Sequence, residues 1–133
     1  MPTVQYMSKE SAQELTTPAF VLRLRVPAQY YESLPLEHKE VLMVQVYPDS
    51  IIPEDICEQI ISFAERAEAA DADIVVHCNE GRFRSRAVAN FIWRFFDEYD
   101  HTGKDWVGKE MSDQNYKSLY NHYKATRGER KRS

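Results

Sequence analysis

The chain has 133 residues, of which 43% are hydrophobic and 29% are charged, and its formal net charge is −4. This length and composition are typical of one ordinary globular domain, so we expect residues 1–133 to form a single domain. The negative charge gives no reason to expect a nucleic acid or an anionic membrane as a partner, and no apolar run approaches the roughly 20 residues that a membrane span needs.

The two cysteines of the chain, Cys57 and Cys78, do not make a disulfide framework. The first residues lack the basic and apolar regions of a signal peptide. Together these features predict a reducing, cytoplasmic location. The histidines are scattered and show no metal-ligand spacing, so we expect no metal and no cofactor.

The first half of the chain predicts a series of strands. A short strand covers Thr3–Met7, and Ser8 then begins a helical stretch as its cap. Ala19–Val26 alternates apolar side chains with two arginines, which predicts a half-exposed strand near an edge of the sheet. Val41–Val46 is largely apolar and suits the sheet interior. Between these two strands, Pro27–Glu40 has no clean periodicity and predicts a surface connection.

After these strands, apolar residues at spacings of three and four predict a helix. Tyr47–Ser50 has turn chemistry, and Pro53 fits the first turn of the helix, where acidic residues suit the positive end of the helix dipole. This helix leads into a buried strand, Asp73–His77. The positions expected to face the sheet are Ile56, Ile60, Phe63, Ala64 and Ala67.

A second long helix is predicted to begin near Arg84, and its pattern is strongly apolar. Asp100–Gly108 is polar and predicts a loop, and Ser112 precedes a last helix. The basic tail, residues 127–133, is expected to be frayed. The core positions of the helix that begins near Arg84 are Val88, Phe91, Ile92, Phe95 and Tyr99, widened by Trp93 and Phe96, and those of the last helix are Tyr116, Leu119, Tyr120 and Tyr123.

Strands that alternate with helices predict an α/β protein with a central, mostly parallel sheet flanked by helices on both sides. Open sheets of this kind bind ligands beyond the carboxyl ends of their strands. The strand Asp73–His77 ends directly before a tight loop and a helix. This loop is therefore the place where we expect a functional site.

Nine residues, His77 to Ser85, read H-C-N-E-G-R-F-R-S and contain this loop. With Gly81 in the middle of the turn, successive backbone N–H groups can point inward at one anion, helped by the positive end of the following helix. Arg84 can close the loop by binding two oxygens of a phosphate-like group. The same positive field lowers the pKa of a thiol, so Cys78 is the candidate nucleophile.

The residues His77-Cys78, Gly81 and Arg84-Ser85 resemble the Cys-x5-Arg signature of cysteine-based protein phosphatases, most closely the small dual-specificity type and its compact bacterial and phage-like members. The resemblance implies that Cys78 attacks phosphorus, that Arg84 binds the equatorial oxygens and that Ser85 assists release of the thiolate. It also implies a phosphorylated protein or another phosphomonoester as the substrate. The residues expected to bind the substrate phosphate are Asn79, Glu80, Gly81, Arg82, Phe83 and Arg84.

The general acid of this family is an aspartic acid on a loop after an interior strand. Asp49 fits this description, because it follows Val41–Val46 on a turn expected at the same edge as the phosphate loop. Asp55 is the second candidate, although its position is also that of a helix N-terminal residue that complements the dipole. His77 is expected to lie buried beneath the cysteine, where it holds the loop and tunes the thiolate, or simply packs in the core.

The sequence leaves several alternatives open. Arg82 stands where phosphoinositide phosphatases of the superfamily carry a basic residue, although Asn79 replaces their second one. A pseudophosphatase that binds phosphorylated groups without turnover would carry the same residue types. A rhodanese-like sulfurtransferase and a low-molecular-weight phosphatase fit less well, because the first has a shorter loop and the second carries its signature near the N-terminus. The substrate, the oligomeric state and any redox role of Cys57 stay open.

Overall fold

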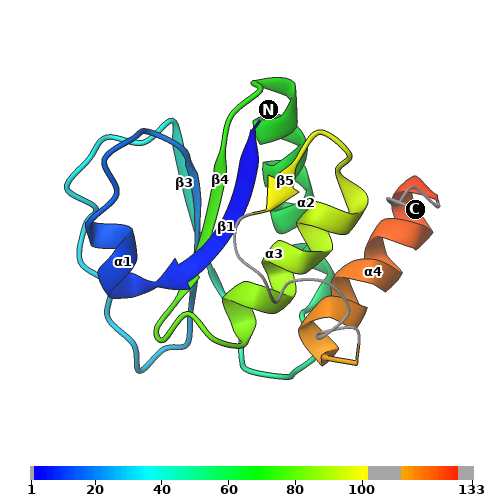
Figure 1. The fold of residues 1–133 in the computed structure, drawn as a ribbon. Helices are drawn as coiled ribbons and strands as arrows, with labels where there is room; N and C mark the ends of the chain where they lie inside the picture. Colours follow the sequence, from blue (N-terminus) through cyan, green and yellow to red (C-terminus); the bar gives the residue numbers. More distant parts are fainter. Residues whose placement is uncertain (1, 102–111, 129–133) are drawn as a thin grey trace.

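The computed structural model describes residues 2–101 and 112–128. Its elements in chain order are β1 (Thr3–Ser8), α1 (Lys9–Gln13), β2 (Phe20–Arg25), β3 (Glu40–Gln45), α2 (Glu54–Ala69), β4 (Ile74–Cys78), α3 (Arg84–Phe95), β5 (Asp100–His101) and α4 (Gln114–Arg127). The strands form one sheet in the order β3-β2-β4-β1-β5 (Figure 1). All strand pairs are parallel, so the strands end at one common edge, and β4 lies in the middle.

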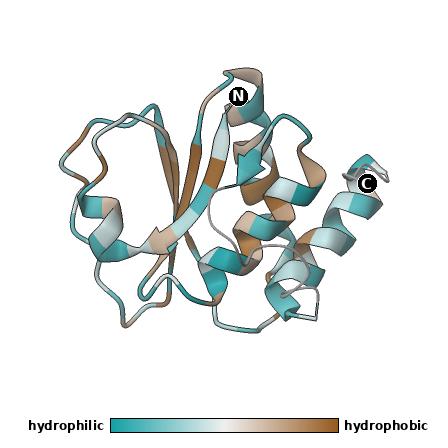
Figure 2. Cartoon of the chain, viewed as in Figure 1, coloured by the Kyte–Doolittle hydropathy of each residue, from teal (hydrophilic) through white to brown (hydrophobic). Residues whose placement is uncertain are grey.

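Helices cover both sides of the sheet, as predicted, but unequally. On one side α2 and α3 pack against the strands, and α4 packs against these two helices (Figure 1). The other side is covered by the five-residue α1 and by the connection 26–39. Apolar residues gather on the strands and on the inner surfaces of the helices (Figure 2). The predicted α/β class is therefore confirmed.

The main core lies between the sheet and α2 and α3. The predicted positions of α2 are buried, except that Ile56 is half-buried, and the predicted stripe of α3 is buried apart from a half-buried Trp93. Tyr99 belongs to this core although α3 ends at Phe95, because its hydroxyl donates a hydrogen bond of 2.6 Å to the carbonyl of Ala72. Each such large apolar side chain contributes about 1.5–3 kcal/mol to folding when it is fully buried.

Two predictions of strand position are wrong. β2 lies between β3 and β4 rather than near an edge, and β3 is an edge strand rather than an interior one. Consequently β3 leaves Val41 and Met43 exposed by 46% and 49%. Arg23 on β2, expected on an open face, is only 6% exposed, because the connection 26–39 folds over it.

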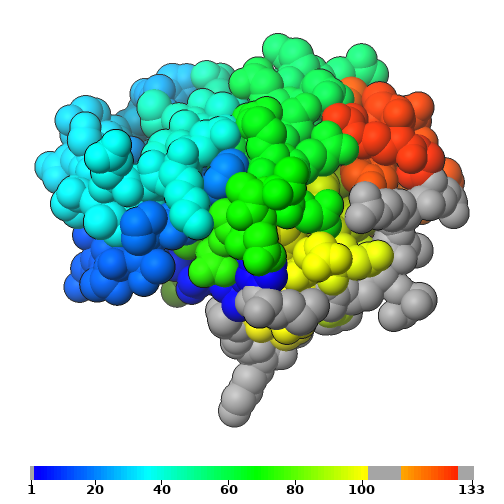
Figure 3. Space-filling view, turned by 90° about the horizontal axis from the view of Figure 1, so that it is seen from above, coloured from blue at the N-terminus to red at the C-terminus, as the bar shows by residue number. Residues whose placement is uncertain are grey.

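The carboxyl-terminal part differs from the expectation in two places. The start of the predicted loop Asp100–Gly108 pairs with β1 as the short strand β5, whereas residues 102–108 lie outside the described residues. Arg127, expected in a frayed tail, is the last residue of α4. Its guanidinium bonds to the carboxylates of Glu58 and Glu65 on α2, at 2.8 and 2.9 Å. Figure 3 shows this end of α4 beside α2. Residues 129–133 of the predicted tail lie outside the described ranges.

The last helix follows Ser112 as predicted, and Asp113 caps it by accepting a hydrogen bond of 2.7 Å from the backbone N–H of Asn115. Within residues 2–101 and 112–128, no helix combines the length and the apolar character that crossing a membrane requires.

Candidate active site

The predicted loop lies at the carboxyl end of β4, the central strand of the sheet. β4 ends at Cys78, residues 79–83 form the turn, and α3 begins at Arg84, which is the expected strand–loop–helix arrangement. The first turn of α3 contains no acidic residue, and Phe83 at its cap makes no side-chain hydrogen bond. The N–H groups at the positive end of this helix are therefore available to an anion.

The bend of the loop requires glycine at position 81. Gly81 has φ of 72°, in the left-handed region that glycine adopts most readily. A Cβ atom at this position would lie 2.5 Å from the carbonyl carbon of Met7 and against the backbone of Ser8. The end of β1 thus packs directly against the loop, and a hydrogen bond of 3.3 Å from Lys9 N to the carbonyl of Asn79 links the two.

The sulfur of Cys78 accepts hydrogen bonds from the loop that surrounds it. The backbone N–H of Gly81 donates to Sγ over 3.2 Å, and the buried hydroxyl of Ser85 lies 3.2 Å from Sγ. Burial by itself raises the pKa of the Cys78 thiol. The Ser85 hydroxyl and the backbone N–H groups of Ser85, Gly81 and Arg82 outweigh burial, so the pKa is lower than usual. This loop therefore favours a thiolate nucleophile.

Arg84 is buried, with 6% of its surface exposed, and it is anchored from the other side of the cleft. Its Nη1 donates to the carbonyl of Val46 at 3.1 Å and to Oε1 of Gln29 at 3.2 Å. In the described part of the chain, Nε and Nη2 of Arg84 have no hydrogen-bond partner. The guanidinium is thus held through Nη1 alone, and the N–H groups of Nε and Nη2 can donate to an oxyanion.

His77, one residue before the cysteine, is completely buried. Its Nε2 accepts a hydrogen bond of 2.9 Å from Nε of Arg23, which places the imidazole proton on Nδ1, 3.3 Å from the carbonyl of Cys78. Tyr31 packs on the imidazole with ring centroids 4.8 Å apart. Burial lowers the pKa of His77 to about 4, so the imidazole is neutral near pH 7 and cannot supply positive charge to the thiolate.

The loop opens into a cleft of about 220 Å³. Its lining residues are Gln29, Pro48, Cys78, Asn79, Glu80, Arg82, Phe83 and Arg84. Five of the six predicted phosphate-binding residues line this cleft, and the sixth, Gly81, points its N–H at the sulfur. Phe83 is 57% exposed at the rim.

The structure places the two acid candidates differently. Asp49 follows Pro48, which lines the cleft, but its Oδ1 accepts a hydrogen bond of 2.9 Å from the backbone N–H of Gln114, so the carboxylate faces the amino end of α4. Asp55 lies in the first turn of α2 and borders a different hollow. Among the described residues that line the cleft, Glu80 carries the only carboxylate.

The turn that carries Asp49 is held by α4. Asn115 is completely buried, and its Nδ2 donates to the carbonyls of Tyr47 and Ser50 at 3.0 and 2.7 Å. One turn further along α4, the hydroxyl of Ser118 accepts from the backbone N–H of Ile52 at 2.9 Å. The amino end of α4 therefore fixes the backbone of this turn beside the cleft.

Sequence reasoning missed three residues that support the site: Arg23, Gln29 and Asn115. None belongs to a local motif, and each acts on a residue far away in the chain, since Arg23 binds His77, Gln29 binds Arg84 and Asn115 binds the turn at Tyr47. The one available signal was that Arg23 and His77 would lie side by side if β2 and β4 were neighbours.

No protein-family model matches the chain, and no curated protein matches it. Among solved structures, the chain is similar to the crystal structure of Tk-PTP in the active form, with 14% sequence identity and a TM-score of 0.45. The match covers 96% of this chain and 82% of that chain. So distant a likeness carries no argument about the reaction.

Proposed function

We propose that this protein hydrolyses phosphomonoesters through a cysteinyl-phosphate intermediate, as a protein tyrosine or dual-specificity phosphatase. The observation that carries the proposal is the environment of Cys78. Its sulfur receives the N–H of Gly81 and faces the Ser85 hydroxyl, and its pKa is lowered, at the bottom of a cleft that also contains the buried guanidinium of Arg84. A nucleophile and a phosphate-binding fork thus face the same small space.

The reaction has two steps. The Cys78 thiolate attacks phosphorus, so that an S–P bond forms while the P–O ester bond breaks, and the leaving oxygen takes a proton from a carboxylic acid. Water then attacks phosphorus and gives its proton back to that carboxylate. The S–P bond breaks, inorganic phosphate leaves, and the Ser85 hydroxyl donates to the returning thiolate. Arg84 and the loop N–H groups hold the three equatorial oxygens throughout, which removes the need for a metal ion.

Asp49 is the proposed acid. Its turn borders the cleft, and Asn115 holds the backbone of that turn, but the carboxylate must leave the N–H of Gln114 before it can reach a leaving group. The proposal requires that rotation about the side-chain bonds of Asp49 exchange this hydrogen bond for one to the substrate oxygen. Glu80 is the competing carboxylate, because it lines the cleft already.

Turnover of a generic aryl phosphate by the purified protein tests this proposal. We expect hydrolysis in the presence of a chelator, with loss of activity in Arg84→Lys, because an ammonium group cannot reproduce the planar fork of a guanidinium. Binding of the aryl phosphate without any release of phosphate would instead make the protein a pseudophosphatase. A requirement for added divalent metal would contradict the proposed site.

The substrate class can be resolved by a turnover panel of phosphotyrosine peptides, phosphoserine peptides and inositol phospholipids. We expect phosphopeptides to be preferred, because Arg82 is the only cation besides the buried Arg84 among the described residues that line the cleft, and the carboxylate of Glu80 disfavours a highly charged headgroup. A preference for inositol phospholipids would favour the phosphoinositide alternative. We also propose a reducing compartment such as the cytoplasm, since a low-pKa thiolate must stay reduced to act.

A further inference from the structure

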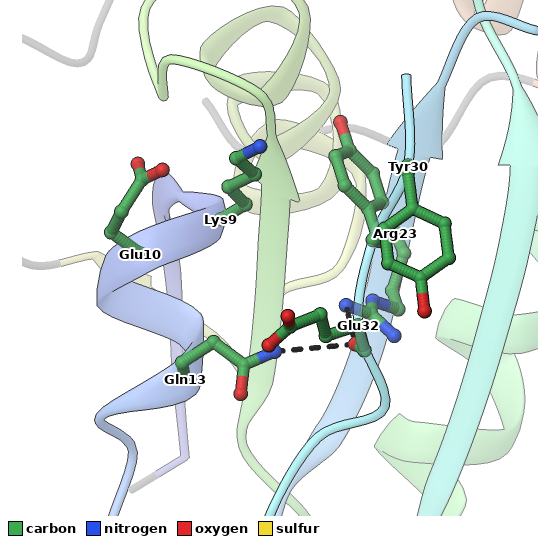
Figure 4. A pocket seen from close by; sticks show the side chains of 7 residues that line it. Lys9, Glu10, Gln13, Arg23, Tyr30 and Glu32 are labelled. Atoms are coloured by element: carbon green, nitrogen blue, oxygen red, sulfur yellow. Dashed lines mark hydrogen bonds between the residues drawn. The ribbon is translucent and has the colours of Figure 1, made fainter. Parts of the chain in front are cut away.

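A second hollow of about 270 Å³ lies on the side of the sheet that α1 covers (Figure 4). It is formed by α1, β2 and the connection 26–39, and its lining residues are Lys9, Glu10, Gln13, Arg23, Tyr30, Tyr31 and Glu32. Figure 4 shows the hydrogen bond from Gln13 Nε2 to the carbonyl of Glu32, 3.2 Å long, which ties α1 to the connection across the hollow.

This hollow is adjacent to the catalytic cleft on two sides. Gln29 lines the cleft and the next residue, Tyr30, lines the hollow. On the opposite side, Asn79 lines the cleft, and its carbonyl accepts a hydrogen bond of 3.3 Å from the backbone N–H of Lys9, which lines the hollow. The linings of the two spaces therefore meet at two places, at Gln29 and Tyr30 and at Asn79 and Lys9. Neighbouring Cα atoms of an extended peptide lie about 3.8 Å apart, so the residues to compare are those next to the phosphorylated one.

The hollow contains a buried cation, Arg23, that pairs with no carboxylate of the described residues. Arg23 is 6% exposed, and its hydrogen-bond partners are the imidazole of His77 and the carbonyl of Glu32, while the ring of Tyr31 lies 5.3 Å from its guanidinium carbon. All of these groups are neutral. In the part of the chain that the structure describes, Arg23 forms no ion pair. A buried charge is costly unless an opposite charge compensates it, so the hollow favours an anion.

The other charged groups of the lining do not cancel this preference. Lys9 is half-buried and adds a second cation. Glu10 and Glu32 are exposed, and water screens exposed carboxylates far more than it screens the buried guanidinium. Tyr30, which is 76% exposed, adds an aromatic surface at the mouth that suits the backbone of a bound peptide.

We propose that this hollow is a subsite for an acidic side chain next to the phosphorylated residue of a protein substrate, with Arg23 and Lys9 holding its carboxylate. This inference rests on the proposed function, because the phosphorylated residue must occupy the cleft at Cys78. It predicts that the enzyme selects phosphopeptides by sequence, through a charge that lies outside the phosphate loop.

The test measures peptide binding to Cys78→Ser, which keeps the cleft but cannot turn the peptide over. Two pairs of phosphopeptides are compared, and the two members of each pair differ only in carrying Glu or Gln at one position. This position directly precedes the phosphorylated residue in one pair and directly follows it in the other. We expect one Glu peptide to bind on the order of tenfold more tightly than its Gln counterpart, the size of one charge-assisted hydrogen bond. Combining Cys78→Ser with Lys9→Glu should abolish this preference. The substitution should leave α1 folded, because an acidic residue in the first turn of a helix interacts favourably with the helix dipole. Lys39→Glu is the matched control, since Lys39 is an exposed lysine at the other end of the sheet, and it should keep the preference.

Equal binding of Glu and Gln peptides, or a preference that survives Lys9→Glu, would overturn the proposal. If no phosphopeptide binds, the proposed function has failed, and the hollow is then tested alone with acetate. Amide shifts at Gln13, Tyr30 and Tyr31 that saturate with acetate and disappear in Lys9→Glu would support an anion site independent of the cleft. The absence of such shifts would overturn the proposal of an anion site in this hollow.

Discussion

Cys78 and Arg84 lie at the two ends of one loop but are stabilised from different sides. The sulfur accepts from the N–H of Gly81 in that loop and faces the Ser85 hydroxyl at the start of α3. The guanidinium is instead anchored by Val46, which directly follows β3, and by Gln29 in the connection 26–39. The nucleophile therefore depends on local backbone geometry, and the phosphate-binding group depends on tertiary packing. A change in the connection 26–39 should weaken phosphate binding without changing the pKa of the thiol.

The role of Asp49 is tested by its dependence on the leaving group. For a substrate with a poor leaving group, Asp49→Asn should lower turnover on the order of 10²-fold, the usual scale of general acid catalysis. The loss should shrink for an activated aryl phosphate, which needs little protonation. The measurement is kcat for a series of aryl phosphates with different leaving-group pKa values.

Two control variants decide between the carboxylates. Asp55→Asn should have little effect on turnover, because Asp55 lies in the first turn of α2 and borders another hollow. If Glu80→Gln shows the leaving-group dependence while Asp49→Asn stays near wild type, Glu80 is the acid and the assignment of Asp49 is wrong. The same pattern in Asp55→Asn would equally contradict it.

His77 makes stability depend on pH. Its pKa falls from an ordinary 6.5 to about 4 in the folded protein, mainly through burial, so the folded state binds a proton less readily than the unfolded chain. The resulting stability is fully present above pH 6.5 and is lost as the pH falls toward 4. The slope from this group is at most about 1.4 kcal/mol per pH unit.

Urea unfolding at several pH values within this window measures the effect. His38 also has a lowered pKa and contributes in the same direction, so the comparison with His77→Gln isolates His77. Glutamine offers Arg23 an acceptor but does not titrate. The variant should lose the His77 part of the slope, and an unchanged slope would show that His77 is protonated in the folded protein or remains accessible to water.

Among the elements, α4 is the one that positions the acid turn. Asn115→Ala should leave the carbonyls of Tyr47 and Ser50 without their donor and should cost about 1–3 kcal/mol of stability, measured by denaturant unfolding. It should also lower turnover for poor leaving groups more than for activated ones, because the backbone that carries Asp49 is released. A variant that loses stability but lowers turnover equally for all leaving groups would show that the turn does not deliver the acid.

A matched control lies on the same helix. Ser118→Ala removes the acceptor for the backbone N–H of Ile52, which lies beyond the turn and does not carry Asp49. It should destabilise the protein without changing the leaving-group dependence. The two variants together separate the stability of the contact between α4 and the turn from the positioning of the acid.

Most helices and strands can be predicted from the sequence, because the patterns that indicate them lie within each segment. The strands before α2 and before α3, and the helix that begins at Arg84, follow from periodicity and from the nine-residue motif. The order of the strands did not follow. β3 has an apolar composition suited to the interior, yet it lies at the edge, because its position is decided by which strand pairs with β2. No property of Val41–Val46 alone encodes that choice.

The site likewise contains residues that one segment predicts and residues that only the fold brings together. The loop from Cys78 to Arg84 was predicted from one short segment, whereas Arg23 and Asn115 act across 54 and 68 positions of the chain. The alternating pattern of β2 predicts that Arg23 faces water, as charged side chains usually do. The connection that buries it has no periodicity from which its path could be inferred. Supporting contacts of this kind become visible only when distant segments are placed side by side.

At the scale of the molecule, the parallel sheet brings the carboxyl ends of its strands to one edge, and this edge holds the cleft and the acid turn. Behind it, α4 packs against α2, where Arg127 binds the carboxylates of Glu58 and Glu65. The central claim is that Cys78 forms a covalent bond to the phosphoryl group in the cleft at this edge.

The most direct measurement is to mix the protein with an aryl phosphate in excess chelator, quench within the turnover time, and determine by mass spectrometry where a phosphoryl group is attached. The account predicts one phosphoryl group on the peptide that contains Cys78, and neither label nor turnover in Cys78→Ser, since a serine hydroxyl stays protonated where a thiolate forms. Turnover without any label on Cys78, or a Cys78→Ser protein that keeps about a tenth or more of wild-type turnover, would contradict it.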